Sequence, residues 1–108
     1  MNKDNWVKHV GFLCKKPEQS FAEFVQHWET LHADLALKLP GLKKYVINPI
    51  DRTQYPDSPI DGFAELWFDS VAEADAAFAT ELGQSVAEDA QGFTSSMTVA
   101  YLNEIHKR

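Results

Sequence analysis

His32 is the residue whose position most favours chemistry. It lies in the segment SFAEFVQHWETLHADLALKLP (residues 20–40), where apolar residues recur with the spacing of an amphipathic helix. At about 100° per residue, these residues share one arc roughly 140° wide, and His32 projects into its middle, after Trp28 and Phe24. Burial lowers the pKa of an imidazole by disfavouring its cation. A neutral imidazole can take a proton from an acidic carbon or hydroxyl and return it elsewhere.

Candidate helpers for His32 lie on the predicted neighbouring strands. A tyrosine hydroxyl or an asparagine amide can stabilise an enolate oxygen by hydrogen bonding, so Tyr45 and Asn48 join His32 as catalytic candidates, with Tyr101 nearby. Apolar side chains that could line a pocket for a ring are the candidate substrate-binding residues, together with Tyr101: Phe12, Phe24, Trp28, Leu66 and Phe68. The alternative is structural, with His32 as a hydrogen-bonded core histidine among aromatic residues that simply fill the core.

Other kinds of site have no sequence support. His27 and His32 are five residues apart, which places them about 140° from each other on a regular helix, with His27 on the polar side. The sequence has no HxxxH, CxxC or HExxH pattern, no glycine-rich phosphate loop and no serine nucleophile elbow. We therefore expect no metal and no cofactor. We interpret Cys14 as a small apolar filler and Glu65 as a structural charge partnered by Lys44 or Tyr45.

The elements that must position these residues follow the order β-α-β-β-α-β, the split βαβ arrangement. The predicted strands cover 5–15, 42–50, 63–68 and 94–105. The first helix is predicted over 20–39, opened by a capping box at Ser20 and Glu23 and ended by Pro40-Gly41. A second helix opens at Ser70 and is interrupted at Gly83, and a short helix follows at 84–91. The polar segment 51–61 is predicted to be a hairpin loop or mobile flap.

This order predicts one α+β domain over residues 1–108, a ferredoxin-like fold with a four-stranded antiparallel sheet. Both faces of the predicted strands carry apolar residues, which we group, by matching registers, into one set with Phe12, Leu66 and Phe68 and another with Leu13 and Tyr45. Two helices can cover only one face. The uncovered apolar face predicts a homodimer in which the sheets pack face to face.

Composition excludes several classes of partner. The net charge of −6 over 108 residues disfavours nucleic-acid binding through phosphate contacts. A single cysteine rules out an internal disulfide and suits a reducing compartment. No apolar run approaches the roughly 18 residues of a membrane span, and the first residues do not resemble a signal peptide. We expect a cytoplasmic protein that binds neither nucleic acid nor membrane.

Several motifs together resemble the EthD-type members of the dimeric α/β-barrel superfamily. They are the helix pattern Phe24-x3-Trp28-x3-His32, the following Leu39-Pro40-Gly41-Leu42, and the strand DGFAELWF at 61–68 before a capped helix. The resemblance implies a ferredoxin-like homodimer with a pocket between the helices and the sheet of each subunit. It also implies kinship with methylmuconolactone methylisomerase, whose helix histidine matches His32 but whose corresponding strand has a cysteine where this chain has Leu66.

The resemblance implies a small cofactor-independent enzyme that acts by proton transfer. The reaction would be isomerisation, dehydration, decarboxylation or cyclisation of a hydrophobic, ring-bearing lactone, phenolic or polyketide-like substrate. Two alternatives remain open, a non-catalytic domain that binds a hydrophobic metabolite and a cofactor-free monooxygenase. A catalytic His32 requires a cavity that reaches its ring and at least one ring nitrogen without a protein partner.

Overall fold

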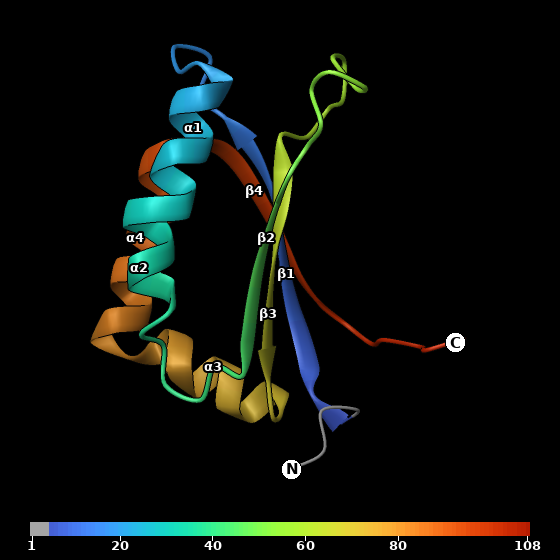
Figure 1. Ribbon diagram of the computed structural model, residues 1–108. Coiled ribbons are helices and arrows are strands. Elements are labelled where there is room, and N and C mark those ends of the chain that lie inside the picture. Colours follow the sequence, from blue (N-terminus) through green and yellow to red (C-terminus); the bar gives the residue numbers. More distant parts are fainter. Residues whose placement is uncertain (1–4) are drawn as a thin grey trace.

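The computed structural model, described over residues 5–108, is a four-stranded antiparallel sheet with helices on one face (Figure 1). The strands are β1 (Val7–Lys15), β2 (Lys44–Pro49), β3 (Gly62–Phe68) and β4 (Thr94–Leu102), in the spatial order β2-β3-β1-β4. Each predicted strand is present, with ends that differ by at most a few residues. The α+β class and the ferredoxin-like arrangement are therefore confirmed.

The first helical rod contains three segments: α1 (Phe21–His27), the π-helix η2 (Trp28–His32) and α2 (Ala33–Ala36). The predicted capping box is present, because Ser20 Oγ accepts the Glu23 amide at 3.1 Å and Glu23 Oε1 accepts the Ser20 amide at 2.9 Å. Gly41 follows the rod with φ of 78°, a left-handed conformation that glycine adopts without strain. The sequence pattern predicted the rod but not its π-helical centre.

The second helical region divides at Thr80 into α3 (Val71–Ala79) and α4 (Glu81–Phe93), not at Gly83 as predicted. Thr80 has extended dihedrals and its hydroxyl caps α4 by accepting the Gly83 amide at 3.0 Å. Gly83 lies inside α4 where a Cβ would come within 2.4 Å of the Ala77 carbonyl oxygen. Glycine is needed there for close helix packing and does not mark a break, so α4 is longer than the predicted helix at 84–91.

The sheet register corrects the predicted grouping of residues by face. Antiparallel partners place their side chains on the same face. Gly11 pairs with Ala64 and Phe12 pairs with Phe63, so the even-numbered side chains of β3 face the helices together with Leu13. The prediction had grouped Phe12 with Leu66 and Phe68, and the structure places it on the opposite, helix-free face.

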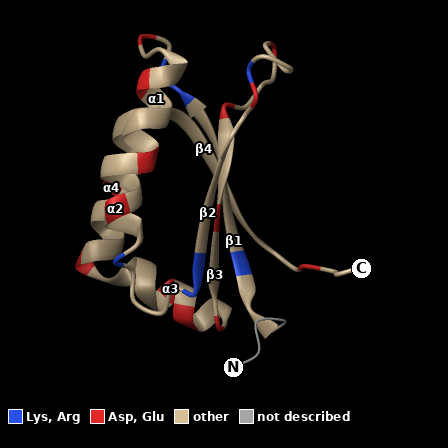
Figure 2. Cartoon of the chain, in the orientation of Figure 1, with Lys and Arg blue, Asp and Glu red and all other residues tan. Residues whose placement is uncertain are grey.

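The helix-free face is apolar with a polar network across it. Glu65 Oε2 accepts Lys8 Nζ at 3.0 Å, and Glu65 Oε1 accepts Asn48 Nδ2 at 3.0 Å. Figure 2 shows basic and acidic positions together on the strands. Glu65 therefore lies on the predicted face, but its partners are Lys8 and Asn48, not Lys44 or Tyr45.

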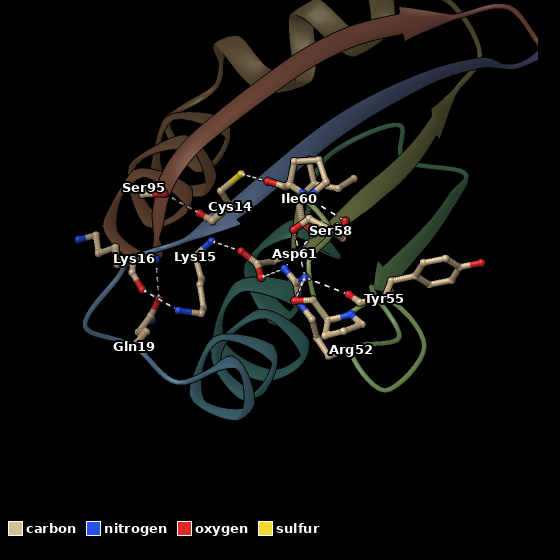
Figure 3. Close-up of polar contacts among 12 residues, drawn as sticks. Cys14, Lys15, Lys16, Gln19, Arg52, Tyr55, Ser58, Ile60, Asp61 and Ser95 are labelled. Atoms are coloured by element: carbon tan, nitrogen blue, oxygen red, sulfur yellow. Dashed lines mark hydrogen bonds and ion pairs between the residues drawn. The ribbon is translucent and has the colours of Figure 1, made fainter.

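The predicted loop at 51–61 folds around Arg52 (Figure 3). The Arg52 guanidinium donates to the carbonyls of Tyr55, Pro56, Ser58 and Ile60, and it pairs with the Asp61 carboxylate. Asp61 is buried and also accepts the Lys15 amide at 2.7 Å. The guanidinium carbon lies 5.7 Å from the Phe21 ring centroid, which places this loop beside the start of α1. At the same end of β1, Cys14 Sγ donates to the Pro59 carbonyl at 3.3 Å.

Across residues 5–108, no helix combines the length and apolarity that crossing a bilayer requires.

Candidate active site

A cavity of about 260 Å³ lies between the helices and the sheet. Its walls come from η2, α2, α3 and α4 and from all four strands: His9, Gly11, Leu13, Trp28, His32, Ala36, Tyr45, Ala64, Leu66, Phe78, Gly83, Val86, Ala87, Ala90, Met97 and Val99. Met97 and Val99 are 41% and 51% exposed, so the cavity reaches the surface along β4. The lining is almost entirely apolar, which suits a compact hydrophobic ligand.

His32 lines this cavity and is only 8% exposed. Its Nδ1 lies 2.8 Å from Oδ2 of Asp89, in α4. A carboxylate only accepts hydrogen bonds, so Nδ1 must carry the proton in this contact. Nε2 makes no hydrogen bond to any residue in the described range. When the ring is neutral, Nε2 therefore holds a lone pair and is the nitrogen available to a ligand.

His27 shares the same carboxylate, which the sequence analysis did not predict. Its Nε2 lies 2.9 Å from Oδ2 and 3.1 Å from Oδ1 of Asp89. Its ring packs on the Phe93 ring, with 4.7 Å between the ring centroids. The prediction assumed a regular α-helix, in which residues five apart diverge. In a π-helix, backbone hydrogen bonds join residues five apart, so such residues lie one above the other in successive turns. The π-helix η2 therefore aligns the side chains of His27 and His32. Single-turn π segments often occur at functional sites.

The protonation states of this cluster follow from burial and charge. Burial lowers the pKa of His32, and the opposing effect of the Asp89 carboxylate is smaller. Burial acts to raise the pKa of Asp89, but hydrogen bonds from His27 and His32 hold it below its ordinary value. At neutral pH the arrangement is a carboxylate that orients a neutral imidazole, the state required of a general base.

Three other cavity residues have buried polar atoms without a hydrogen-bond partner in residues 5–108. They are Trp28 Nε1, Tyr45 Oη and His9 Nδ1. Burial raises the pKa of Tyr45 to about 12, so its hydroxyl stays protonated. Burial also lowers the pKa of His9, against a smaller effect of Asp75. His9 is therefore a second neutral imidazole in the same cavity.

The structure brings together four of the predicted site residues: Trp28, His32, Tyr45 and Leu66. Phe24 and Phe68 are fully buried in the adjoining core and do not line the cavity. The Tyr101 ring packs on the His9 ring, with 5.3 Å between the ring centroids. Its hydroxyl donates a hydrogen bond to Asp75 Oδ1 at 2.6 Å.

Two further predicted site residues lie on the other side of the sheet. The rings of Phe12 and Phe63 pack together on the helix-free face, with 5.9 Å between their centroids. Asn48 is on the same face, where its amide donates to Glu65 and to the Phe63 carbonyl. The prediction placed both near His32 because it did not have the correct strand registers.

Sequence reasoning missed Asp89 and His9. Asp89 belongs to an acidic stretch that resembled a solvated helix surface, yet it adjoins the apolar positions Val86, Ala90 and Phe93, which face the core. The spacing of these apolar positions was the sequence signal that could have placed Asp89 next to the core. His9 alternates with Gly11 and Leu13 on the helix-facing side of β1, a parity that the apolar pattern alone left undefined.

Residues 5–108 contain no group of three or more histidine, cysteine or acidic side chains arranged to hold a metal ion. His27 and His32 instead share one carboxylate as hydrogen-bond donors.

Comparison with known proteins identifies similar sequences and folds. The chain is 31% identical, over 84 residues, to an uncharacterized 11.0 kDa protein encoded in the thcB-thcC intergenic region of Rhodococcus erythropolis; the match covers 77% of this chain and 82% of that protein. The crystal structure of an ethyl tert-butyl ether d (EthD) family protein from Bacillus halodurans has a TM-score of 0.79 and 26% identity, and the match covers 93% of this chain and 99% of that one.

Two more distant structures share the fold. The hydroxynitrile lyase from Passiflora edulis has a TM-score of 0.76 at 17% identity, covering 97% of each chain. A dimeric ferredoxin-like protein of unknown function from Thermobifida fusca has a TM-score of 0.73 at 11% identity, covering 90% of this chain and 89% of that one. Residues 16–96 match the EthD domain, which is most of the chain. The protein therefore belongs to the EthD family.

Proposed function

We propose that this protein is a small enzyme that needs no cofactor and transfers a proton on a hydrophobic, ring-bearing substrate. The proposal depends chiefly on the state of His32, which lines the apolar cavity. Its Nδ1 donates to Asp89 at 2.8 Å, and its Nε2 has no hydrogen-bond partner among residues 5–108. A neutral, oriented imidazole in such a place can remove a proton from a carbon next to a carbonyl and return it to another atom. Isomerisation, dehydration, decarboxylation and cyclisation all use such a step.

Each residue has a distinct proposed role. His32 is the general acid–base, and Tyr45 donates a hydrogen bond to the oxygen on which charge develops. Asp89 is a positioning residue that fixes the tautomer and orientation of His32. Trp28 and Leu66 shape the apolar walls. The Passiflora protein of the same fold is a lyase, which is consistent with proton chemistry on this scaffold.

We also propose that two copies pair through the helix-free face of the sheet. This face carries the partly exposed apolar side chains Phe12, Val46 and Phe63. Apolar side chains exposed on a sheet face that no helix covers often mark an interface. The Thermobifida protein, which shares the fold, is described as dimeric.

Exchange of carbon-bound protons tests the catalytic proposal without knowledge of the natural substrate. The probe 2-indanone is a small ring ketone with acidic protons next to its carbonyl, and their replacement by deuterium in D₂O is followed by NMR. The wild-type protein should accelerate the exchange above the buffer rate. His32→Gln should reduce the acceleration by about 10² to 10⁴, the usual contribution of a positioned general base. A His32→Gln protein that melts like the wild type and retains the acceleration would contradict the proposal.

A further inference from the structure

Two of the polar atoms without a hydrogen-bond partner in residues 5–108 belong to side chains that line the same cavity. Trp28 is fully buried, and its indole N–H has no acceptor within residues 5–108. The Tyr45 hydroxyl is also buried and has no partner there. The indole N–H interacts weakly with the Tyr45 oxygen, short of hydrogen-bond geometry, and partly opposes the rise that burial causes in the Tyr45 pKa. Buried donors without partners are rare in native proteins and call for an explanation.

The chemistry of these groups defines what would satisfy both. An indole N–H can only donate a hydrogen bond. A tyrosine hydroxyl can donate or accept, and this one stays protonated at neutral pH. One oxygen acceptor from a ligand could take both hydrogen bonds, as the oxygen of a carbonyl does in an oxyanion hole.

The charge of the cavity wall limits the ligand further. Among residues 5–108, the titratable residues that line it are His9, His32 and Tyr45, and none of the lining residues is a lysine or an arginine. The pKa values of both histidines are lowered by burial, so neither imidazole offers a positive charge at neutral pH. An ionised carboxylate in this cavity would be buried without a partner, which is strongly unfavourable. The ligand is therefore neutral.

The size of the cavity fits a ring of one or two cycles. Its volume is about 260 Å³. An engineered apolar cavity of about 150 Å³ in another protein binds benzene. A substituted single ring or a small fused ring system is the corresponding class here.

We propose that Trp28 and Tyr45 form a two-donor subsite that binds the carbonyl oxygen of a neutral ring ketone or lactone, while the ring fills the apolar cavity. This inference rests on the proposed function and deepens it, because it assigns the part of the substrate that the subsite recognises. It gives the Trp28 N–H a binding role in addition to packing.

Calorimetric binding of three probes that share one ring system tests the subsite: indane, 2-indanone and indane-2-carboxylate. The wild-type protein should bind 2-indanone about tenfold more tightly than indane, a ratio that corresponds to one or two hydrogen bonds. Indane-2-carboxylate should bind more weakly than indane. Equal affinities for indane and 2-indanone, or tightest binding of the carboxylate, would overturn the proposal.

Tyr45→Phe is the informative variant because it removes only the hydroxyl. It should lower the affinity for 2-indanone about three- to tenfold and leave the affinity for indane unchanged. The melting temperature of the free protein should be unchanged or higher, since the deleted hydroxyl has no partner in the described structure. A lower melting temperature with unchanged 2-indanone affinity would show that the hydroxyl is structural.

Nitrogen–proton NMR of the indole groups tests Trp28 without a core substitution. The protein has three tryptophans, and Trp67 Nε1 already donates to Glu104 at 2.8 Å. 2-Indanone should shift the Trp28 indole proton downfield, and indane should not. Equal shifts with both probes would overturn the role of Trp28. His32→Gln should keep the preference for 2-indanone while losing proton exchange, so failure of the subsite and failure of catalysis give different results.

Discussion

At the scale of single residues, burial is the main determinant of the protonation states of His9, His32 and Tyr45 in the cavity. His32 is held by one carboxylate and His9 by none in the described residues. Trp28 and Tyr45 have donors without a hydrogen-bond partner in residues 5–108. Such groups reduce stability in the free protein. Their concentration around one cavity is typical of a site arranged for binding, where function opposes stability.

The lowered histidine pKa values predict how stability depends on pH. His9 and His32 have folded pKa values below 6.5, so between those values and pH 6.5 the unfolded chain binds more protons than the folded chain. The free energy of unfolding should therefore decrease as the pH falls from 7.5 to 5.5, and each histidine replaced by Gln should make the decrease smaller. Urea denaturation at pH 7.5 and at pH 5.5 measures this decrease in the free energy of unfolding. A free energy of unfolding that increases toward pH 5.5 would show that His32 is protonated against Asp89 in the folded state.

Sequence alone predicted His32 and much of its environment, but not the residue that orients it. The apolar arc identified Trp28 and His32 because burial follows helix periodicity there. Asp89 could not be assigned because its contact joins two elements 57 residues apart, and a contact of that kind is defined only by tertiary packing.

At the scale of elements, helix packing depends on a few local departures from regular geometry. The π-helix η2 aligns two histidines, and Thr80, which has extended dihedrals, separates α3 from α4. Capping and apolar spacing predicted that these helices exist. They did not predict the π segment or the position of the break, because both depend on how the helices fit the sheet and one another.

The two glycines of α4 should respond in opposite ways to the same substitution. At Gly83, a Cβ would lie 2.4 Å from the Ala77 carbonyl oxygen and 2.5 Å from the Phe78 Cα, so Gly83→Ala should destabilise the protein by about 1–3 kcal/mol. At Gly92, a Cβ meets nothing within 4 Å, and Gly92→Ala should stabilise it by up to about 1 kcal/mol.

Thermal and chemical unfolding of the two variants measure this difference. Gly92→Ala is the matched control, since it makes the same change in the same helix without the close contact. If Gly83→Ala were as stable as the wild type, α4 would not pack on α3 as closely as described.

At the scale of the whole molecule, the two faces of the sheet have different tasks. The side of the sheet on which the helices lie (Figure 1) builds the cavity. The helix-free side carries Phe12 and Phe63, next to the Lys8–Glu65 pair. The sequence predicted that both faces are apolar. It did not predict which residues lie on each, because a shift of one residue in register moves a strand's side chains to the other face.

The proposed homodimer predicts a selective effect of charge on the helix-free face. Phe63→Glu should shift the protein from dimer to monomer in analytical ultracentrifugation, because an unpaired carboxylate would be buried between the sheets. Leu31→Glu is the control, since Leu31 is 63% exposed on the helical rod and should leave the dimer intact. A wild-type protein that sediments as a monomer at high concentration would contradict the proposal.

The role of the unprotonated Nε2 of His32 as the base can be measured through the pH dependence of proton exchange from 2-indanone. The wild-type rate should fall as the pH decreases through a single pKa below 6.5. Asp89→Asn should be slower, with that pKa moved lower, because the carboxylate raises the pKa of His32. His32→Gln should show only the buffer rate at every pH. A wild-type rate that rises as the pH decreases, or a pH profile that persists in His32→Gln, would show that His32 is not the base.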